Sequence, residues 1–554
     1  MLASGSAGAK QRTAGRYIVT AKSPEDLQAL KADLSAKGAK VDDSLSAINA
    51  VSVDLDGAGA GAVAASSHVA SLGKSGIRRL IDPEGAFSAT PTLRKTKVAD
   101  PASSLPGLMW NLDRIESPAA NSITDGRKNV IVGVADTGLD FTHSELAKQI
   151  VHVEDFTGTE NPPICKTFFN PPASDADWAA TFGGPATTDW NGHGSWIGGN
   201  IAASRDGVGI NGIAPGVSLV ALKISQWCGS AYDSEILDAF MYAADHGIDI
   251  VSISFGGYLD RSDPDQDAIY QTYVNVVRYA RSKGTLIVAA AGNEHTRIGE
   301  GGRVLSHGSL TLPGDPVVDL YGQYETPGGI PGVVDVSSTG NVVMAASASC
   351  DPSTIGANAT CKPTSDAHQP LRPGSTDQLA YYSNYGPRID IAGPGGARKF
   401  NVPNADRGGT PGWPYTTADG FTDFEDFSIT SNWALEIPCF TFPAGNGVFY
   451  PDECYSAIQG TSMATPHVSG VAALIASANR DARHDPARIL ELLRSGARDA
   501  HNFTPGLSAT DTSPGDRTGL ACSAGYCHLG GRRIDDREAY GAGIVDAVRS
   551  LHDH

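Results

Sequence analysis

Beyond residue 128 the chain contains five runs of apolar residues that lack the polar alternation of a strand exposed on one face. Runs of this kind are typical of strands buried on both faces of a parallel sheet. Stretches with apolar residues at helical spacing separate them, notably 234–247 and 267–283. Strands that alternate with helices predict an α/β fold, here a doubly wound, mostly parallel sheet flanked by helices. The five runs are 129–135, 218–224, 249–255, 285–291 and 333–337.

Residues 16–87 follow a different pattern, in which short strand-like and helix-like stretches alternate. Ser23 and Pro24 supply a helix N-cap and a proline at the first helical position, and leucines then recur at helical spacing as far as Gly38. The order of these stretches predicts a small α+β domain of the split βαβ, ferredoxin-like type. The candidate strands are 16–22, 48–55 and 77–81, and a second, Ala-rich helix is predicted at 60–72.

The chain therefore divides into four parts. Segment 1–15 is expected to be disordered, and 16–87 forms the small domain. Residues 88–106 carry Pro, Ser and Lys without periodicity and are expected to be an exposed linker. The large domain spans 107–554. Long Gly-, Pro- and Asp-rich stretches within it are expected to be surface insertions, near 157–190, 297–330, 345–378 and 397–456.

The composition excludes several classes of protein. With 554 residues, 41% hydrophobic and 19% charged, the chain is too apolar for a disordered polyelectrolyte. A formal net charge of -19 opposes the basic surface that a phosphate backbone requires, so nucleic acid is not expected as a partner. No apolar run is long enough to span a bilayer, so we expect no membrane partner. We also expect a monomer.

The eight cysteines bear on the compartment. They contain no CxxC pair, which disfavours a zinc ribbon or a thioredoxin-type site. Disulfides are favoured over buried free thiols, and with them an oxidising compartment, although the pairing cannot be deduced from sequence. Residues 1–16 lack the apolar core of a secretory signal, so either the protein is cytosolic or its signal is not part of this sequence. Because the cysteines favour an oxidising compartment, we expect a secreted protein. Three neighbouring pairs close short loops: Cys350/Cys361, Cys439/Cys454 and Cys522/Cys527.

Two candidate catalytic residues flank buried or small-residue segments. Asp136 follows the apolar run 129–135 directly, and groups at the carboxyl ends of parallel strands face the ligand crevice of an open sheet. His193 lies between two glycines, which let a substrate approach a side chain that exchanges protons near neutral pH. Taken singly, the aspartate could equally form a turn and the histidine could be structural.

Two further candidates lie later in the chain. Ser462 stands where a loop enters a helix of small residues, and the N–H groups at a helix start can support an oxyanion. Its ordinary alternative is an N-cap serine. Asn293 follows the apolar run 285–291 and could donate a side-chain N–H to the same oxyanion, with a turn residue as the alternative. Together the four residues supply a nucleophile, a base, an orienting carboxylate and an oxyanion donor.

Four blocks around these residues resemble the subtilisin-like (subtilase) family of serine endopeptidases, in the family's order of Asp, His, Asn and Ser. The resemblance extends from about residue 108 to 548. It implies that Ser462 is the nucleophile, His193 the general base and then acid, and Asp136 the residue that orients the imidazole. Asn293 and the Ser462 backbone N–H would then hold the oxyanion. The blocks are Val134-Ala-Asp-Thr-Gly138, Gly192-His-Gly-Ser195, Ala290-Ala-Gly-Asn293 and Gly460-Thr-Ser-Met-Ala-Thr-Pro-His-Val468.

The resemblance also implies a substrate cleft. Two segments should add an extended peptide between their backbones, a mode of binding that reads the shape of a peptide more than its sequence. Gly292 and Gly256 would border the pocket for the side chain before the scissile bond. The two segments are Ser254-Phe255-Gly256 and Gly229-Ser230-Ala231.

Three positions depart from the family's pattern or extend it. Trp196 stands where the family usually has the second residue of a Thr-His pair. Asp233 stands where the pocket rim often has an aromatic residue. We expect an ordinary exposed aspartate there, and the alternative is a residue that favours basic side chains farther from the cut. Catalysis would require no cofactor, but the resemblance admits a structural calcium ion with oxygen ligands from Glu145 and Asp206. An ordinary Asp-Gly turn is the alternative for Asp206.

The small domain resembles the subtilase propeptide, which implies a folding aid that caps the cleft and is then removed, with the cut expected in the linker 88–106. An unrelated small appendage is the alternative. The leading hypothesis is a secreted serine endopeptidase that forms an acyl-enzyme, is made as a self-inhibited zymogen and acts on proteins or peptides. The second hypothesis is a catalytically silent subtilase-like module that only binds peptides.

Overall fold

The fold is taken from a computed structural model. The predicted linker 88–106, most of segment 1–15 and most of the insertions at 157–190, 345–378 and 397–456 lie outside the described residues. The structure describes residues 12–81, 109–157, 165, 188–207, 209–306, 319–340, 377–380, 382–396, 429–434, 455–502, 520–523, 526–529 and 533–552.

A parallel sheet of seven strands forms the centre of the large domain, in the order β15-β14-β12-β10-β6-β8-β7. The predicted α/β fold with a mostly parallel sheet is confirmed. Each of the five apolar runs supplies a strand because its side chains are buried on both faces. The strands are β6 (Ile131–Asp136), β7 (Ile150–Asp155), β8 (Ser218–Lys223), β10 (Ile250–Ile253), β12 (Leu286–Ala290), β14 (Val334–Thr339) and β15 (Ile391–Pro394).

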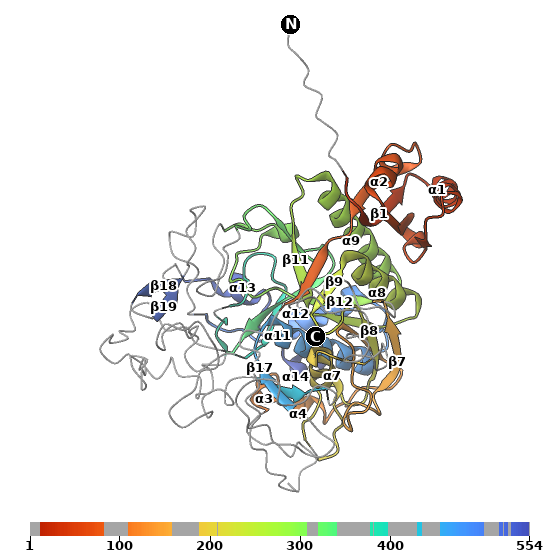
Figure 1. The fold of residues 1–554 in the computed structure, drawn as a ribbon. Coiled ribbons are helices and arrows are strands. Elements are labelled where there is room, and N and C mark those ends of the chain that lie inside the picture. The colour runs from red at the N-terminus through yellow and green to blue at the C-terminus, as the bar shows by residue number, and fades with distance from the viewer. Residues whose placement is uncertain are drawn as a thin grey trace.

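Helices cover both faces of this sheet (Figure 1). Neighbouring residues of one strand serve opposite layers: Ile250 packs in the cluster with helices α7 and α11, and Val251 packs in the cluster with α8 and α9. The period of two along a strand therefore produces a three-layer domain. The bounds are α7 (His193–Ala202), α8 (Asp233–Asp245), α9 (Pro264–Ser282) and α11 (Thr461–Ala478).

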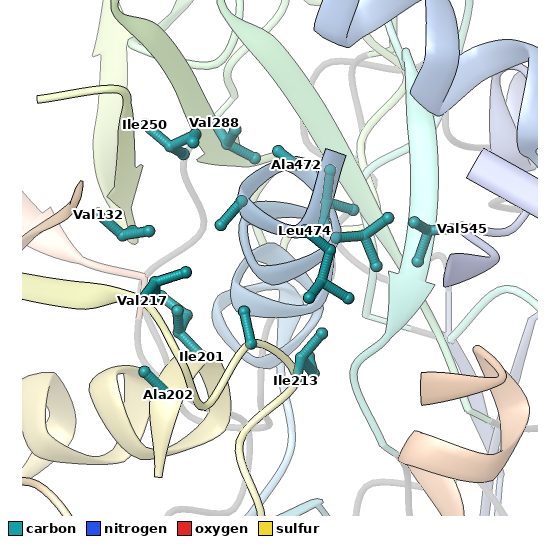
Figure 2. Packing of buried hydrophobic residues seen from close by; sticks show 14 of the residues in the cluster. Val132, Ile201, Ala202, Ile213, Val217, Ile250, Val288, Ala472, Leu474 and Val545 are labelled. Carbon is teal, nitrogen blue, oxygen red and sulfur yellow. The ribbon is translucent and has the colours of Figure 1, made fainter. Parts of the chain in front are cut away.

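Helix α11 lies in the centre of one apolar layer (Figure 2). Ala472 and Leu474 of this helix pack in one cluster with Val132, Val288 and other strand residues. All residues from Thr461 to Ser477 are buried. A helix that is buried all round is held firmly, so its first turn, which carries Ser462, has a fixed position relative to the sheet.

The remaining elements of the large domain surround this frame. They include a short 3₁₀ turn, η2 (Glu300–Gly302), and the helices α3 (Trp110–Arg114), α4 (Ser117–Ala120), α12 (Pro486–Gly496), α13 (Asp536–Tyr540) and α14 (Ala547–Leu551). Two pairs of antiparallel strands are β16 (Ile429–Asn432) with β17 (Tyr455–Ile458), and β18 (Leu520–Ser523) with β19 (Tyr526–Leu529). Within the described ranges, no helix is both long and apolar enough to cross a bilayer.

The small domain is an antiparallel sheet of order β2-β3-β1-β4 with two helices. Ser23 accepts a hydrogen bond from the Asp26 N–H, as expected of the predicted N-cap. The predicted helix 60–72 is wrong in its second half: the helix ends at Ala64, and the residues that follow form a strand paired with β1. Its elements are β1 (Gly15–Ala21), α1 (Pro24–Ala36), β2 (Val41–Asp42), η1 (Ser46–Ile48), β3 (Ala50–Leu55), α2 (Gly57–Ala64) and β4 (Val69–Lys74).

The next strand, β5 (Ile77–Leu80), leaves the small domain and joins the large one. It pairs with strands of the large domain on both sides, in a sheet of order β13-β11-β5-β9. The small domain itself packs beside α8 and α9 (Figure 1). The partner strands are β9 (Ser230–Tyr232), β11 (Phe255–Leu259) and β13 (Tyr324–Thr326).

One disulfide joins Cys165 to Cys228, with 5.4 Å between the Cα atoms and 63 residues between them in sequence. Both lie outside the three neighbouring pairs considered from sequence. Cys228 is adjacent to Gly229, so the disulfide anchors the loop that leads into β9. Cys522 and Cys527 face each other across the β18–β19 hairpin, and their side chains lie outside the described part of the chain, as do the other two pairs.

Candidate active site

Asp136 and His193 form a buried pair at the carboxyl end of β6. The Asp136 carboxylate accepts from His193 Nδ1 at 2.9 Å (Oδ1) and 3.0 Å (Oδ2). Both side chains are 1% exposed. Nδ1 must carry a proton to make this bond, so Nε2 of a neutral ring is the basic nitrogen. His193 Nε2 is buried and makes no hydrogen bond to any described group.

Asp189 organises the loop that leads into His193, a role that sequence reasoning did not assign. Its Oδ1 accepts from Gly192 N (2.8 Å) and Thr137 Oγ1 (2.8 Å), and its Oδ2 accepts from Ser195 N (2.8 Å). These bonds connect the turn after β6 to the start of α7 and so fix the distance between Asp136 and His193. Asp189 lies four residues before the start of α7, whose N-cap position is occupied by Gly192.

Gly194 permits the close packing of these two segments. A Cβ at this position would collide with the carbonyl oxygen of Gly138, on the turn after Asp136. Any side chain at position 194 would therefore push the histidine helix away from the aspartate.

Ser462 is the second residue of α11, and its backbone N–H belongs to the first turn, where helix N–H groups have no intrahelical partner. Asn293 lies beside this turn. Its Oδ1 accepts from the Thr461 N–H (3.0 Å) and from Thr461 Oγ1 (2.8 Å). With the carbonyl edge of the amide held by Thr461, the orientation of the Nδ2 edge is determined. The structure thus brings Asn293 and Ser462 together across 169 residues of sequence.

The substrate-pairing segments predicted from sequence flank strand β5. On one side Arg78 pairs with Ala231 and Arg79 with Ser230, and on the other side Arg79 pairs with Gly256, all antiparallel. The Leu80 N–H donates to Gly229 O at 2.7 Å. An extended segment of this chain therefore lies between the two backbones named in the prediction.

The strand ends at the candidate nucleophile. The Ile81 N–H donates to Ser254 O at 2.9 Å, and the Ser462 hydroxyl donates to the carbonyl oxygen of Ile81 at 2.7 Å. A Cβ at Gly256 would lie 3.3 Å from Ile81 Cδ1, so Gly256 borders the Ile81 side chain. Phe255 is fully buried and packs in one apolar cluster with Leu80 of this strand.

Gly292 lies behind this site, with a backbone φ of +99°. A Cβ here would collide with Asn384 Nδ2 and would approach Glu294 Oε2. Glu294 accepts a hydrogen bond from Tyr258 OH at 2.8 Å and one from Asn384 Nδ2 at 3.2 Å. Burial raises the pKa of the Glu294 carboxyl. This buried polar group supports the Gly292 backbone, and sequence reasoning missed it because its members come from three separate segments.

Asp233 is fully buried, so the expectation of an ordinary exposed aspartate at this position is wrong. Its carboxylate lies at the start of α8 and pairs with Arg78 of β5. Trp196, the other departure noted from sequence, is also fully buried and packs in the core beside α11.

The two predicted calcium ligands have different environments. Glu145 is 1% exposed, and its oxygens accept from Ile210 N (3.3 Å) and Asn432 Nδ2 (3.3 Å), so the carboxylate has protein partners. Asp206 is exposed. No group of three or more His, Cys, Asp or Glu side chains that could hold a metal occurs in the parts of the chain that the structure describes. The calcium ion stays a prediction.

Comparisons with known proteins identify the family of this chain. A sequence profile of the subtilase family matches residues 127–510, which is more than half of the chain. Thermitase of Thermoactinomyces vulgaris is 25% identical over 377 residues, which cover 68% of this chain and 85% of thermitase. Subtilisin E of Bacillus subtilis is 26% identical over 478 residues, which cover 86% of this chain and 83% of that protein.

Solved structures show the same fold. Fervidolysin of Fervidobacterium pennivorans, described as a keratinolytic enzyme related to subtilisin, matches with a TM-score of 0.59 and 20% identity. The match covers 99% of this chain and 62% of fervidolysin. The epidermin leader peptide processing serine protease of Staphylococcus aureus matches with a TM-score of 0.57 and 18% identity, over 97% of this chain and 98% of that one.

The sheet topology is that of a subtilisin-like serine protease. The chain belongs to the subtilase family.

Proposed function

We propose that this protein is a secreted serine endopeptidase made as a self-inhibited precursor, with Asp136, His193 and Ser462 as its catalytic triad. Ser462 Oγ attacks the carbonyl carbon of an extended peptide while His193 Nε2 takes the hydroxyl proton. Asp136 holds the imidazole and stabilises its cation. Asn293 Nδ2 and the Ser462 N–H donate to the oxyanion.

The second half of the reaction uses the same groups. His193 gives its proton to the amine of the leaving segment, the C–N bond breaks, and the acyl group remains on Ser462. A water molecule then attacks the acyl carbon, with His193 again as base. The buried Nε2 of His193, which has no hydrogen-bond partner among the described residues, supports its role as this base.

The observation that carries the proposal is the hydrogen bond of 2.7 Å between Ser462 Oγ and the carbonyl oxygen of Ile81. Strand β5 pairs on both sides as an extended substrate would, and it ends at this carbonyl. We therefore propose that residues 12–81 act as an intramolecular inhibitor and that the bond between Ile81 and Asp82 is the first to be cut. This bond precedes the linker 88–106, where the cut was expected from sequence.

The disulfide between Cys165 and Cys228 supports maturation in an oxidising compartment, because such bonds persist outside the reducing cytosol. The substrates we propose are proteins or peptides that present an extended segment to β9 and β11. The bonds to this segment are mostly main-chain bonds, which do not by themselves restrict its sequence.

The test compares the full wild-type chain with Ser462→Ala. The wild type is expected to yield a product whose N-terminus is Asp82, as read by N-terminal sequencing, and to react with a fluorophosphonate after this cut. Ser462→Ala is expected to stay uncut and unlabelled.

Ser469→Ala is the matched control, since Ser469 is buried on the same helix and its hydroxyl makes no hydrogen bond to described residues. It should mature like the wild type. An uncut, unlabelled wild type would refute the peptidase and favour the silent peptide-binding module. A cut within 88–106 with normal labelling would refute only the assignment of the bond.

A further inference from the structure

A buried ion pair connects β5 to the wall of the cleft. Arg78 Nε donates to Asp233 Oδ1 at 2.6 Å, and Arg78 Nη2 donates to Oδ2 at 3.0 Å. The side chains are 7% and 0% exposed. Two parallel bonds between a guanidinium and a carboxylate fix direction as well as charge, so this contact is specific to the shape of arginine.

The large domain holds the carboxylate in place. Tyr273 of α9 donates its hydroxyl to Asp233 Oδ1 at 2.9 Å, and Asp233 itself is the first residue of α8, where the helix dipole favours a negative charge. Arg78 and the Gly76 N–H (2.8 Å) also donate to this carboxylate, and both belong to the N-terminal segment. When this segment leaves, Asp233 loses its counter-ion.

The register defines which residue of a bound peptide reaches Asp233. The reacting carbonyl is that of Ile81, and Arg78 is the fourth residue when one counts back from Ile81 as the first. Side chains alternate along β5: Arg78 and Leu80 are buried, and Arg79 between them is exposed. A peptide that pairs with β9 and β11 in the same register therefore directs its fourth side chain toward Asp233.

The cleft wall also has room for a guanidinium. A Cβ on Gly257 would lie 3.1 Å from Arg78 Nη1, so the absence of a side chain at this position leaves the space free. The same Nη1 donates to Tyr258 O at 3.4 Å. A neutral side chain in this space would bury the Asp233 carboxylate without a counter-charge, which is strongly unfavourable. Lysine would supply the charge without the planar fork.

We propose that Asp233 is a specificity-determining residue that selects arginine as the fourth residue before the scissile bond. This inference rests on the proposed function, because it concerns the peptide that the enzyme cuts. It goes beyond that function because main-chain pairing alone sets no sequence preference.

The test uses the self-processed enzyme obtained from the full chain. Quenched fluorescent peptides carry the chain's own sequence 77–83, with Arg, Lys or Gln at the position of Arg78. Cleavage after the isoleucine is expected to show kcat/KM about 100-fold higher for Arg than for Gln, because an unpaired buried charge is costly in the complex. Lys is expected to lie between the two.

Asp233→Asn is expected to reduce the Arg-to-Gln ratio to less than about threefold, mainly through slower cleavage of the Arg peptide. Asp245→Asn, an exposed carboxylate near the end of the same helix, is the matched control and should keep the wild-type ratio. If Asp233→Asn fails to mature, the relative rates at which the wild-type enzyme cleaves the three peptides still test the inference. Equal cleavage of all three peptides would overturn this inference alone, whereas no cleavage together with an unlabelled Ser462 would overturn the proposed function.

Discussion

Residues 12–81 contact the large domain at two surfaces whose chemistry differs. In the cleft, β5 forms main-chain hydrogen bonds with β9 and β11 and adds one buried ion pair, Arg78 with Asp233. On the outer face of α8 and α9, which we name the docking face, the contact is made by side chains. Apolar residues of the small domain, Ile18, Leu45 and Ala50, pack in one cluster with residues of these helices.

The docking face also contains polar contacts that only this domain can make. Ser75 accepts from the Ser234 N–H at 3.0 Å, Ser44 hydrogen-bonds Asp238, and Arg12 pairs with Asp265 at 2.9 Å. Any extended peptide can reproduce the main-chain bonds of the cleft, but no ordinary substrate can reproduce the docking face. We infer that the two surfaces have different roles. The cleft determines which peptide is cut, and the docking face determines how slowly the N-terminal domain dissociates after the cut.

The largest expected effect comes from Asp136→Asn, which acts only in the cleft. The asparagine should favour the wrong tautomer of His193, and we expect kcat to fall about 10⁴-fold for both self-processing and peptide cleavage. Self-processing is followed by mass spectrometry and peptide cleavage by fluorescence. Asp155→Asn, at the carboxyl end of the edge strand β7, is the matched control and should stay close to the wild type. A variant of Asp136 that processes itself at the wild-type rate would exclude the triad.

A smaller effect is expected for Asn293→Ala. Loss of one oxyanion donor should lower kcat by about 100–1,000-fold and leave KM nearly unchanged, because the donor acts on the charge that develops in the transition state. Thr461→Val removes the hydroxyl that donates to Asn293 Oδ1 and tests whether the amide must be oriented. It should lower kcat less than Asn293→Ala does. A change in KM alone for Asn293→Ala would mean that the residue binds substrate and does not hold the oxyanion.

The sequence predicted the central strands well and the edge strands poorly. β10 and β12 are buried on both faces, so their apolar runs are unambiguous. The edge strand β7 has exposed residues, among them Val151 and His152, and no run marks it. β15 is short and ends in Gly393-Pro394, which are unusual in a strand interior. A strand could therefore be predicted from the sequence when both of its faces are buried.

At the candidate site, contacts between residues that are distant in sequence could not be predicted either. The residues of the four sequence blocks could be named because each block is local. The partnership of Arg78 with Asp233 spans 155 residues, and it depends on β5 leaving the small domain to pair in the cleft. Propensity predicts that 77–81 is a strand, but it cannot say which sheet the strand joins.

The smallest expected effect concerns the docking face. Burial raises the pKa of Glu235 to about 8 and that of Asp238 to about 7. The charged groups around them are Arg16, Asp42 and Asp155, and the first of these opposes the rise. A carboxyl with a raised pKa binds its proton more tightly in the docked state, so docking is strongest at low pH and weakens as pH rises toward these values. We expect the opening equilibrium of the small domain to increase between pH 6 and pH 8.

Amide hydrogen exchange of the uncut Ser462→Ala chain measures this opening at α9 and β4, after correction for the intrinsic pH dependence of exchange. Asp238→Asn removes one of the two titrating groups and should reduce the pH dependence, whereas Asp245→Asn, exposed on the same helix, should not. Because β5 keeps its place in the uncut chain, a change confined to α9 and β4 would separate the docking face from the cleft. Exchange that rises equally in β5 would show that the two surfaces open together. Exchange that does not change with pH would contradict the role of Glu235 and Asp238.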